Sequence, residues 1–459
     1  MITSTTTETD VVVIGAGISG LTAARCLHND GYRVVVLEQN DRVGGRTWSA
    51  STEGGPVDFG GMFIGSTHDR SLALGRSLGL TTVSAIKPGT DVLIVPSGRM
   101  DAPDGELPAG SPIRESLANA YRRLDALAEA VGAKAPWDHA RAVELDDLTV
   151  ADWLDQEVTC PDVRALLEVD LNCVLGAGTG DASLLYLAYY VAQCEGIRTL
   201  LATHGGAQNE WWIGGAGQIS ERIAVELGDA IHLSTRATSI KHDEGGATVS
   251  TQHGAFRARQ VIIATPPAAA SAISFSPRLP RQRAQLQMRA PLGRMSKIQV
   301  RYPSAFWEDH GYSGAITDTE TLGIMIFPGT KPADSQATLI GFIAGRLLDR
   351  FAVLSEDERR SKILGLLEQC YGPQAASPTY FHETDWSQQD GALGGPATFM
   401  PTGVLSTVGT ALRQQIGVLH FAGTEAASGW TGYMEGAVRA GETAATTVSA
   451  ALAQLTQNA

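Results

Sequence analysis

The sequence predicts an α/β protein that begins with a βαβ unit, and three observations support this. An apolar run at 11–14 stops at Gly15, apolar residues then recur at helical spacing as far as Gly31, and a second apolar run covers 34–37. Short apolar runs bounded by glycine are typical of buried strands, and a glycine after a helical pattern marks the helix end. The two strands are therefore expected to lie parallel, with the helix crossing between them.

Three glycines and one acidic residue in this unit predict that it binds a dinucleotide. Gly15 permits the tight turn, Gly17 lets a pyrophosphate approach the backbone, and Gly20 brings the helix close to the strand. The helix N-terminus offers unpaired N–H groups to the anion. Glu38, which lies 18 residues after Gly20, can accept a hydrogen bond from a ribose hydroxyl. The unit alone does not distinguish FAD from NAD.

The segment after Glu38 favours a flavin. Gly44 and Gly45 precede Arg46, and a second Gly-Gly pair follows in "VDFGGMFIGSTHDR" at 57–70. Ordinary turns would explain one such pair, but two pairs around one arginine make turns alone a poor explanation. The arrangement resembles the extension of the flavin amine oxidases, in which the arginine approaches the pyrophosphate.

Composition and charge exclude several other classes of protein. The chain has 459 residues, of which 43% are apolar and 18% charged, so it is expected to fold into more than one core. A net charge of −14 disfavours nucleic acid and anionic lipid as partners. The five cysteines show no CxxC spacing, which argues against a disulfide framework or a metal site. The first ten residues lack the features of a leader and the last nine lack a membrane-spanning run, so a cytoplasmic protein without a membrane partner is expected.

The later elements are interleaved, without repeats or low-complexity linkers. Helical periodicity covers 113–131, 184–202 and 357–370, and continues through Ala437, Ala440, Ala444 and Val448. Strand patterns cover 247–251 and 259–267, where the run stops at Pro266 and Pro267 as the last strand of a nucleotide domain would.

Long segments spread over nearly the whole chain resemble the flavin-dependent monoamine oxidases, and among them the bacterial cyclohexylamine oxidases. They are "GGMFIGSTHDR", "SLLYLAYYVAQCEGI", "GGAQNEWWIGGAGQISERIA", "APLGRMSKIQVRYPSAFW", "YFHETDW", "GGPATFMPTGV" and "HFAGTEAASGWTGYMEGAVRAGE". The resemblance implies the amine oxidase fold. An FAD domain of the glutathione-reductase type would comprise 1–82, 212–287 and 388–459, and an α+β substrate domain would comprise 83–211 and 288–387.

The resemblance also implies a set of cofactor-binding residues. In the tail, the glycine-rich segment would lie near the pyrophosphate and ribityl chain, and the N-terminus of the last helix would stabilise negative charge on the reduced flavin. Gly395 and Pro396 stand where the mammalian enzymes carry a flavin-linked cysteine and a tyrosine, so FAD is expected to bind non-covalently. Asn40 stands where an arginine is more common, which puts one contact on the adenine side in doubt. The implied set is Gly15, Gly17, Ser19, Gly20, Glu38, Gly45, Arg46, Gly61, Met62, Phe63, Ala237, Gly423, Thr424, Glu425, Gly432, Tyr433 and Met434.

Three residues match catalytic positions of the family. Lys297 matches a lysine that assists the reaction of reduced flavin with oxygen. Trp386 matches the tryptophan that packs near this lysine, and Tyr433 matches one wall of an aromatic cage for the amine. Taken singly, Lys297 would be read as solvent-facing and the two aromatic residues as core.

The same carry-over implies an apolar substrate cavity with one amide. Its residues would be Phe63, Leu200, Leu201, Gln208, Met325, Phe327, Phe342, Pro396 and Tyr433. These positions hold no arginine for a carboxylate and no acidic partner for a second ammonium, so amino acids and diamines are expected to be poor substrates.

We therefore expect an oxidase of neutral, alicyclic primary amines that uses FAD and molecular oxygen and releases ketone or aldehyde, ammonia and hydrogen peroxide. The alternatives are a polyamine or alkaloid oxidase, which would need acidic pocket residues or a longer channel, and a non-oxidase FAD protein such as a desaturase or isomerase. The pattern leaves open whether the protein is a monomer or a homodimer.

Overall fold

The largest sheet is assembled from three separated parts of the chain. The computed structural model describes residues 6–457, and in it the strand order is β10-β2-β1-β13-β12-β11-β14, with β20 also paired to β13. The central strand β1 lies parallel to both β2 and β13. The strands are β1 (Thr6–Ile14), β2 (Val34–Leu37), β10 (Ile231–His232), β11 (Ala237–Asp243), β12 (Gly246–Thr251), β13 (Gly254–Ile263), β14 (Ser274–Ser276) and β20 (Leu419–Phe421).

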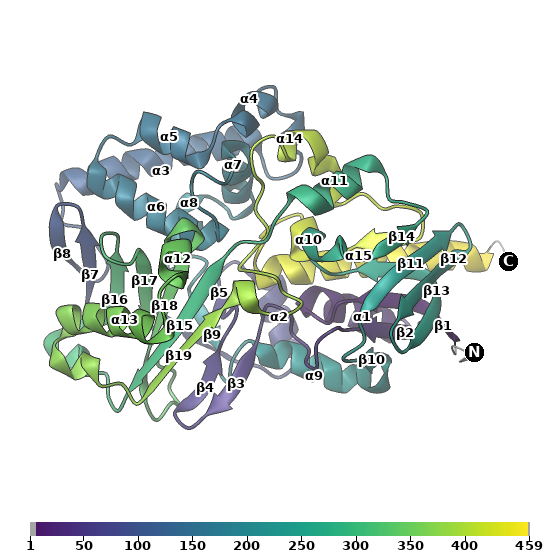
Figure 1. Cartoon of the computed structure of the whole chain (residues 1–459), viewed down its shortest axis with the longest axis horizontal. Helices are drawn as coiled ribbons and strands as arrows, with labels where there is room; N and C mark the ends of the chain where they lie inside the picture. The colour runs from purple at the N-terminus through teal and green to yellow at the C-terminus, as the bar shows by residue number, and fades with distance from the viewer. Residues whose placement is uncertain (1–5, 458–459) are drawn as a thin grey trace.

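Helices from both ends of the sequence cover this sheet. In Figure 1 the purple helix α1 (Ile18–Asn29) and the yellow helix α15 (Met434–Gln457) lie together, and α1 also packs against α9 (Gly217–Leu227). Their apolar faces share one buried core with β1 and β2. The short helices α2 (Asp69–Ser77), α10 (Pro267–Ala270) and α11 (Arg281–Arg289) complete this part of the molecule.

A second sheet, at the left of Figure 1, has the strand order β19-β15-β18-β17-β16-β7-β8. Helix α13 (Glu356–Tyr371) buries its apolar side against it, and α12 (Gly345–Ala352) contacts β18. The strands are β7 (Thr90–Val95), β8 (Gly98–Pro103), β15 (Met295–Tyr302), β16 (Tyr312–Asp318), β17 (Ile324–Pro328), β18 (Ala337–Ala344) and β19 (Tyr380–Asp385).

A layer of helices with its own apolar core lies beside the second sheet. Its helix α6 contacts β17 and β18, which places one face of α6 over that sheet. The helices are α3 (Pro112–Val131), α4 (Ala142–Asp147), α5 (Val150–Glu157), α6 (Pro161–Leu175), α7 (Leu184–Gln193), α8 (Ile197–Leu201) and α14 (Leu405–Val408).

Two small sheets lie between these parts. One pairs β3 (Ser49–Thr52) with β4 (Gly55–Asp58), and the other has the order β5-β9-β6, formed by β5 (Phe63–Ile64), β9 (Glu210–Trp212) and β6 (Thr82–Ser84). Each large sheet draws its strands only from the segments expected for one domain, whereas β6 and β9 lie across the expected boundaries at 82/83 and 211/212. The exact boundaries therefore stay a prediction.

The structure differs from the sequence expectation in two places. The helical pattern at 184–202 is two helices, because Glu195 and Gly196 adopt φ of 62° and 103°, which a right-handed helix excludes. The strand expected over 259–267 is β13, which ends at Ile263. It is a central strand and not the last one of its sheet, because β20 follows it in the sequence and pairs with it.

No helix within residues 6–457 combines the length and apolar character that crossing a bilayer requires. The expectations about both chain ends fall partly on residues 1–5 and 458–459, which lie outside the described residues.

Candidate active site

One continuous cavity runs from the β1–α1 turn to the aromatic side chains of the second sheet. At its first end, Gly15 has φ of 103°, and α1 begins after Gly17 with no side chain capping its free N–H groups. A methyl group at Gly17 would have only one neighbour, Gly44 O at 4.0 Å, so the backbone there is open to a ligand. Ser19 lines this end, and its buried Oγ has no hydrogen-bond partner among the described residues. These features fit a pyrophosphate.

Glu38 lies at the same end and is held by the backbone. Its Oε2 accepts a hydrogen bond from Ala16 N at 2.8 Å, and its Oε1 accepts one from Asn40 N at 2.9 Å. Burial raises the pKa of the Glu38 carboxyl, while these N–H donors oppose the rise. Asn40 also lines the cavity, so the position that departs from the family pattern lies where an adenosine end would be.

Three residues expected to contact a ligand do not line the cavity. Gly20 packs α1 against the preceding turn, because a methyl group there would lie 2.0 Å from Gly15 O. Glu425 is buried, and its Oε1 accepts hydrogen bonds from Arg46 Nη1 at 2.9 Å and Thr398 Oγ1 at 3.1 Å. Leu200 is part of the helical core. Gly20 and Glu425 therefore position Gly15 and Arg46, which do line the cavity.

The remaining expected residues are brought together. Arg46 also donates to Pro396 O at 3.1 Å, which joins the early arginine motif to the segment expected to form the amine cage. The cavity is lined by Gly15, Gly17, Ser19, Glu38, Gly45, Arg46, Gly61, Met62, Phe63, Ala237, Leu201, Gln208, Lys297, Met325, Phe327, Phe342, Trp386, Pro396, Gly423, Thr424, Gly432, Tyr433 and Met434.

Lys297 lies inside the protein, and the solvent-facing alternative is wrong. Every residue of β15 is buried, so alternation along the strand carried no information, and Lys297 is 1% exposed. Its Nζ donates to Gly60 O at 2.7 Å and lies 3.1 Å from Met62 Sδ. Burial is the main reason that the pKa of Lys297 falls to about 7.

Trp386 holds the backbone beside this lysine. Its indole Nε1 donates to Phe59 O at 2.9 Å, one residue before the carbonyl that accepts from Lys297. The two side chains thus fix consecutive carbonyls of one loop, and both line the cavity.

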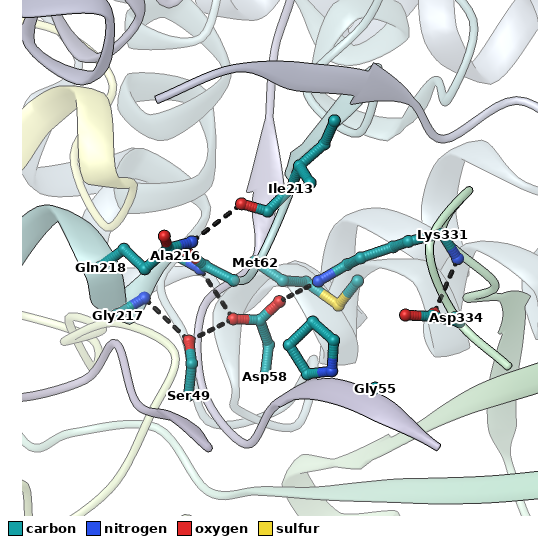
Figure 2. Close-up of polar contacts among 12 residues, drawn as sticks. Ser49, Gly55, Asp58, Met62, Ile213, Ala216, Gly217, Gln218, Lys331 and Asp334 are labelled. Atoms are coloured by element: carbon teal, nitrogen blue, oxygen red, sulfur yellow. Dashed lines mark hydrogen bonds and ion pairs between the residues drawn. The ribbon is translucent and has the colours of Figure 1, made fainter. Parts of the chain in front are cut away.

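A buried ion pair that acts electrostatically on Lys297 joins three parts of the chain (Figure 2). Asp58 accepts from Lys331 Nζ at 2.9 Å, from Ser49 Oγ at 2.6 Å and from Ala216 N at 2.8 Å. The positive charge of Lys331 is the largest of the influences that lower the pKa of the Asp58 carboxyl against the opposing effect of burial. Asp58 in turn raises the pKa of Lys297, and Lys331 lowers it. The sequence reasoning did not find this pair, whose members are 273 positions apart.

Apolar rings contribute to the wall at the second end. The Phe63 and Phe327 rings meet edge to face with centroids 5.5 Å apart, and Phe327 and Phe342 likewise at 5.9 Å. Gln208 donates from Nε2 to Leu200 O at 3.2 Å, so the core leucine fixes the one amide. Tyr190, which was not anticipated, lines the cavity with its ring centroid 6.4 Å from that of Tyr433.

Asp170 also lines the cavity, together with Cys173 and Val174 of the same helix. The expectation that the cavity offers no acidic partner is therefore wrong. The signal was present in the sequence as the second of two acids in "LLEVDLNCVL", but acids in a helix are usually solvent-facing.

A family model described as "Flavin containing amine oxidoreductase" matches residues 18–449 of the chain. The chain belongs to this family. It is 35% identical to the flavin-containing amine oxidase B of Sus scrofa, over 98% of this chain and 88% of the relative. It is 36% identical to a putative flavin-containing monoamine oxidase, AofH, of Mycobacterium tuberculosis, over 96% of this chain and 97% of that protein.

Solved structures of amine oxidases share the fold. The cyclohexylamine oxidase of Brevibacterium oxydans IH-35A is 50% identical, with a TM-score of 0.95 over 97% of this chain and 99% of that one. A putrescine oxidase solved with bound putrescine is 30% identical, with a TM-score of 0.93 over 97% of this chain and 100% of that one. The expected fold class is confirmed, and this amine oxidase is a flavin-dependent oxidoreductase.

Within the part of the chain that the structure describes, no group of three or more His, Cys, Asp or Glu side chains is arranged to hold a metal ion.

Proposed function

We propose that this amine oxidase oxidises primary amines with compact hydrocarbon groups, of which cyclohexylamine is the model. The supporting observation is the apolar chamber of Phe63, Phe327 and Phe342 beside Pro396 and Tyr433, which the buried Lys297 also lines. A saturated ring gains from burial against such a wall, at about 0.8 kcal/mol per CH₂ group. The similarity to a protein named cyclohexylamine oxidase supports the same substrate class.

The overall reaction balances with oxygen as the oxidant. The amine loses two electrons and two protons, one hydrogen from the carbon and one from the nitrogen, and the resulting imine reacts with water to give a ketone or aldehyde and ammonia. Oxygen takes up the two electrons and two protons as hydrogen peroxide. The flavin, when bound, supplies the two-electron acceptor that links these halves.

The chain's own residues provide orientation and charge. Tyr433 and Pro396 face the cavity where the amine would lie, and the apolar rings exclude water from the hydrocarbon part. Lys297 is held by Gly60 O, so its charge is fixed in place before oxygen arrives, and a fixed charge needs no reorganisation when negative charge develops.

The cofactor we propose is FAD, bound without a covalent link. The long cavity, with free N–H groups at α1 and Glu38 beyond them, suits a dinucleotide form of the flavin. Gly395 carries no thiol, so acid or heat denaturation should release the yellow colour into solution. Colour that remains with the precipitated protein would contradict this assignment.

A panel of amines in a peroxide-coupled assay tests the proposed substrate class. Cyclohexylamine should give the highest kcat/KM among monoamines, followed by simple alkyl and arylalkyl amines, and L-amino acids should be poor because Arg46 is already paired with Glu425. An L-amino acid that outpaces cyclohexylamine would overturn the pocket assignment. Absence of amine-dependent peroxide with every amine would instead favour a desaturase or isomerase.

The proposal includes a cytoplasmic location, because the five cysteines are unpaired. Gel filtration of the holoenzyme distinguishes the monomer from the homodimer.

A further inference from the structure

Asp170 is a carboxylate on the cavity wall that nothing in the described chain neutralises. It lies on α6, three residues before Cys173 and four before Val174, so the three side chains share one helix face, and all three line the cavity. Within residues 6–457, its side chain makes no hydrogen bond or ion pair. An unpaired acid facing an apolar chamber is costly, and such groups are rarely retained without a partner.

The position of Asp170 along α6 places it away from the amine end. At the C-terminus of the helix, a methyl group on Gly176 would lie 2.7 Å from both Gly395 O and Pro396 Cδ, so this end of α6 abuts the expected cage wall. One turn earlier, Cys173 Sγ lies 3.9 Å from Phe342 O. Asp170 is another turn back, about 9 Å from Gly176 along the axis at the usual helical rise.

The groups around Asp170 leave its charge available to a ligand. Tyr121 of α3 and Cys173 of α6 interact with it electrostatically, and burial raises the pKa of both, so both are neutral at ordinary pH. Arg198 of α8 lies over the Tyr121 ring at 5.2 Å and forms no ion pair with Asp170. Strand β17, which contacts α6, brings Met325 and Phe327 to the cavity wall, and Val174 of α6 adds a further apolar side chain.

We propose that Asp170 forms a second, cation-binding position, which holds the distal ammonium of a diamine whose other amine lies at Pro396 and Tyr433. This inference rests on the proposed amine oxidase function and extends its substrate class from hydrocarbon amines to amines with a basic group at the far end. The preferred diamine has an apolar middle long enough to reach from the cage to Asp170. The reaction at the proximal amine is unchanged, and the distal ammonium takes no part in it.

The ionisation of Asp170 gives this position a pH dependence. Burial raises the pKa of the Asp170 carboxyl to about 7. Only the ionised carboxylate attracts an ammonium, and a bound ammonium in turn favours the ionised form. The advantage of a diamine over its matched monoamine should therefore grow as the pH rises through about 7.

The main experiment compares cadaverine with pentylamine, which differ only in the distal amine. The ratio of their kcat/KM values is measured by peroxide release for the wild-type holoenzyme, Asp170→Asn and Glu168→Gln. Glu168 is the matched control, because it lies on the same helix but does not line the cavity.

Asp170→Asn should lower the cadaverine-to-pentylamine ratio by about tenfold or more, as expected when a charge-assisted contact is lost. It should also abolish the rise of that ratio with pH, whereas Glu168→Gln should keep both. An unchanged ratio in Asp170→Asn overturns the proposal. So does an equal advantage for aminopentanol, since a hydroxyl group would then serve as well as a cation.

A binding measurement separates this inference from the function on which it rests. Menthane diamine and tert-octylamine carry no hydrogen on their amine-bearing carbons, so they bind without being oxidised. Calorimetric titration should show tighter binding of the diamine by wild type and loss of that preference in Asp170→Asn. If no amine yields peroxide, the proposed function fails, and the titration still decides whether Asp170 binds a cation.

Discussion

The two ends of the cavity are constructed differently. At the nucleotide end the ligand would meet backbone: Gly15, Gly17, the N-terminus of α1 and the loop at Gly44 and Gly45. At the amine end it would meet side chains from distant segments, namely aromatic rings and Lys297, with Asp170 farther along the same wall. A site formed by backbone needs glycines, because any side chain there would fill the space of the ligand. A site formed by side chains needs particular functional groups, and each buried charge among them needs a neutralising partner. The two ends should therefore fail in different ways.

The largest expected effect is at the nucleotide end. Gly20→Ala puts a methyl group 2.0 Å from Gly15 O, a backbone atom that cannot move aside. The loss of folding stability should exceed the value of about 1–3 kcal/mol that is typical of overpacked sites, so we expect little soluble flavoprotein. Expression yield and flavin content measure this.

The matched change is Gly17→Ala, where the nearest atom would be 4.0 Å away. This variant should unfold near the wild-type temperature when free of flavin, yet bind flavin more weakly. Equal behaviour of the two variants would remove the distinction between a packing glycine and a ligand-facing one.

At the amine end, the largest effect should come from loss of charge compensation. Lys331→Met leaves the Asp58 carboxylate buried without its ion-pair partner, which costs about 3 kcal/mol or more in similar sites. Urea unfolding of the apoprotein measures the change. Adding Asp58→Asn should recover part of the loss, and a double variant no more stable than the single one would contradict the assigned role of the pair.

Lys297→Met tests whether the buried charge serves the oxygen side of the reaction. Loss of one preorganised group typically costs about a hundredfold in rate. The reaction of the reduced holoenzyme with oxygen should slow by about this factor in rapid mixing, and amine binding should change less. An unchanged oxygen rate constant would leave Lys297 a structural lysine. Lys241→Met, on an exposed site, is the control.

The smallest expected effect is a shift in the pH at which the rate of the oxygen reaction falls. The pKa of Lys297 is about 7, so its positive charge is present below that value and lost above it. The oxygen rate should therefore fall as the pH rises through about 7. Asp58 is the group that raises the pKa of Lys297, so in Asp58→Asn the fall should occur at lower pH. A displacement toward higher pH would contradict the electrostatic effect of Asp58 on Lys297.

The same contrast explains what could be predicted from the sequence. The nucleotide end is a contiguous pattern, and the expected turn at Gly15 and helix start after Gly17 are found because spacing along the chain determines spacing in a turn. The dinucleotide contacts stay a prediction. The packing role expected of Gly20 agrees with its close approach to Gly15 O, although Gly20 does not line the cavity.

The amine end depended on resemblance, because its residues pair only through the tertiary fold. Lys297 lies on a strand buried on both faces, where alternation says nothing. The Asp58–Lys331 pair has no local signature, and Asp170 resembles an ordinary surface acid until α6 is seen to face the cavity. The break between α7 and α8 was missed because apolar periodicity continues across Glu195 and Gly196.

The strand order of the first sheet has a consequence for biosynthesis. Strand β1 emerges from the ribosome early, but its partner β13 begins at Gly254, and β20 and Glu425 follow far later. At a synthesis rate of about 5–20 residues per second, β1 and β2 remain without β13 for on the order of ten seconds or longer. During that interval a very apolar strand edge is exposed to other nascent chains. Overexpression of this enzyme should therefore benefit from slower synthesis or from added chaperones.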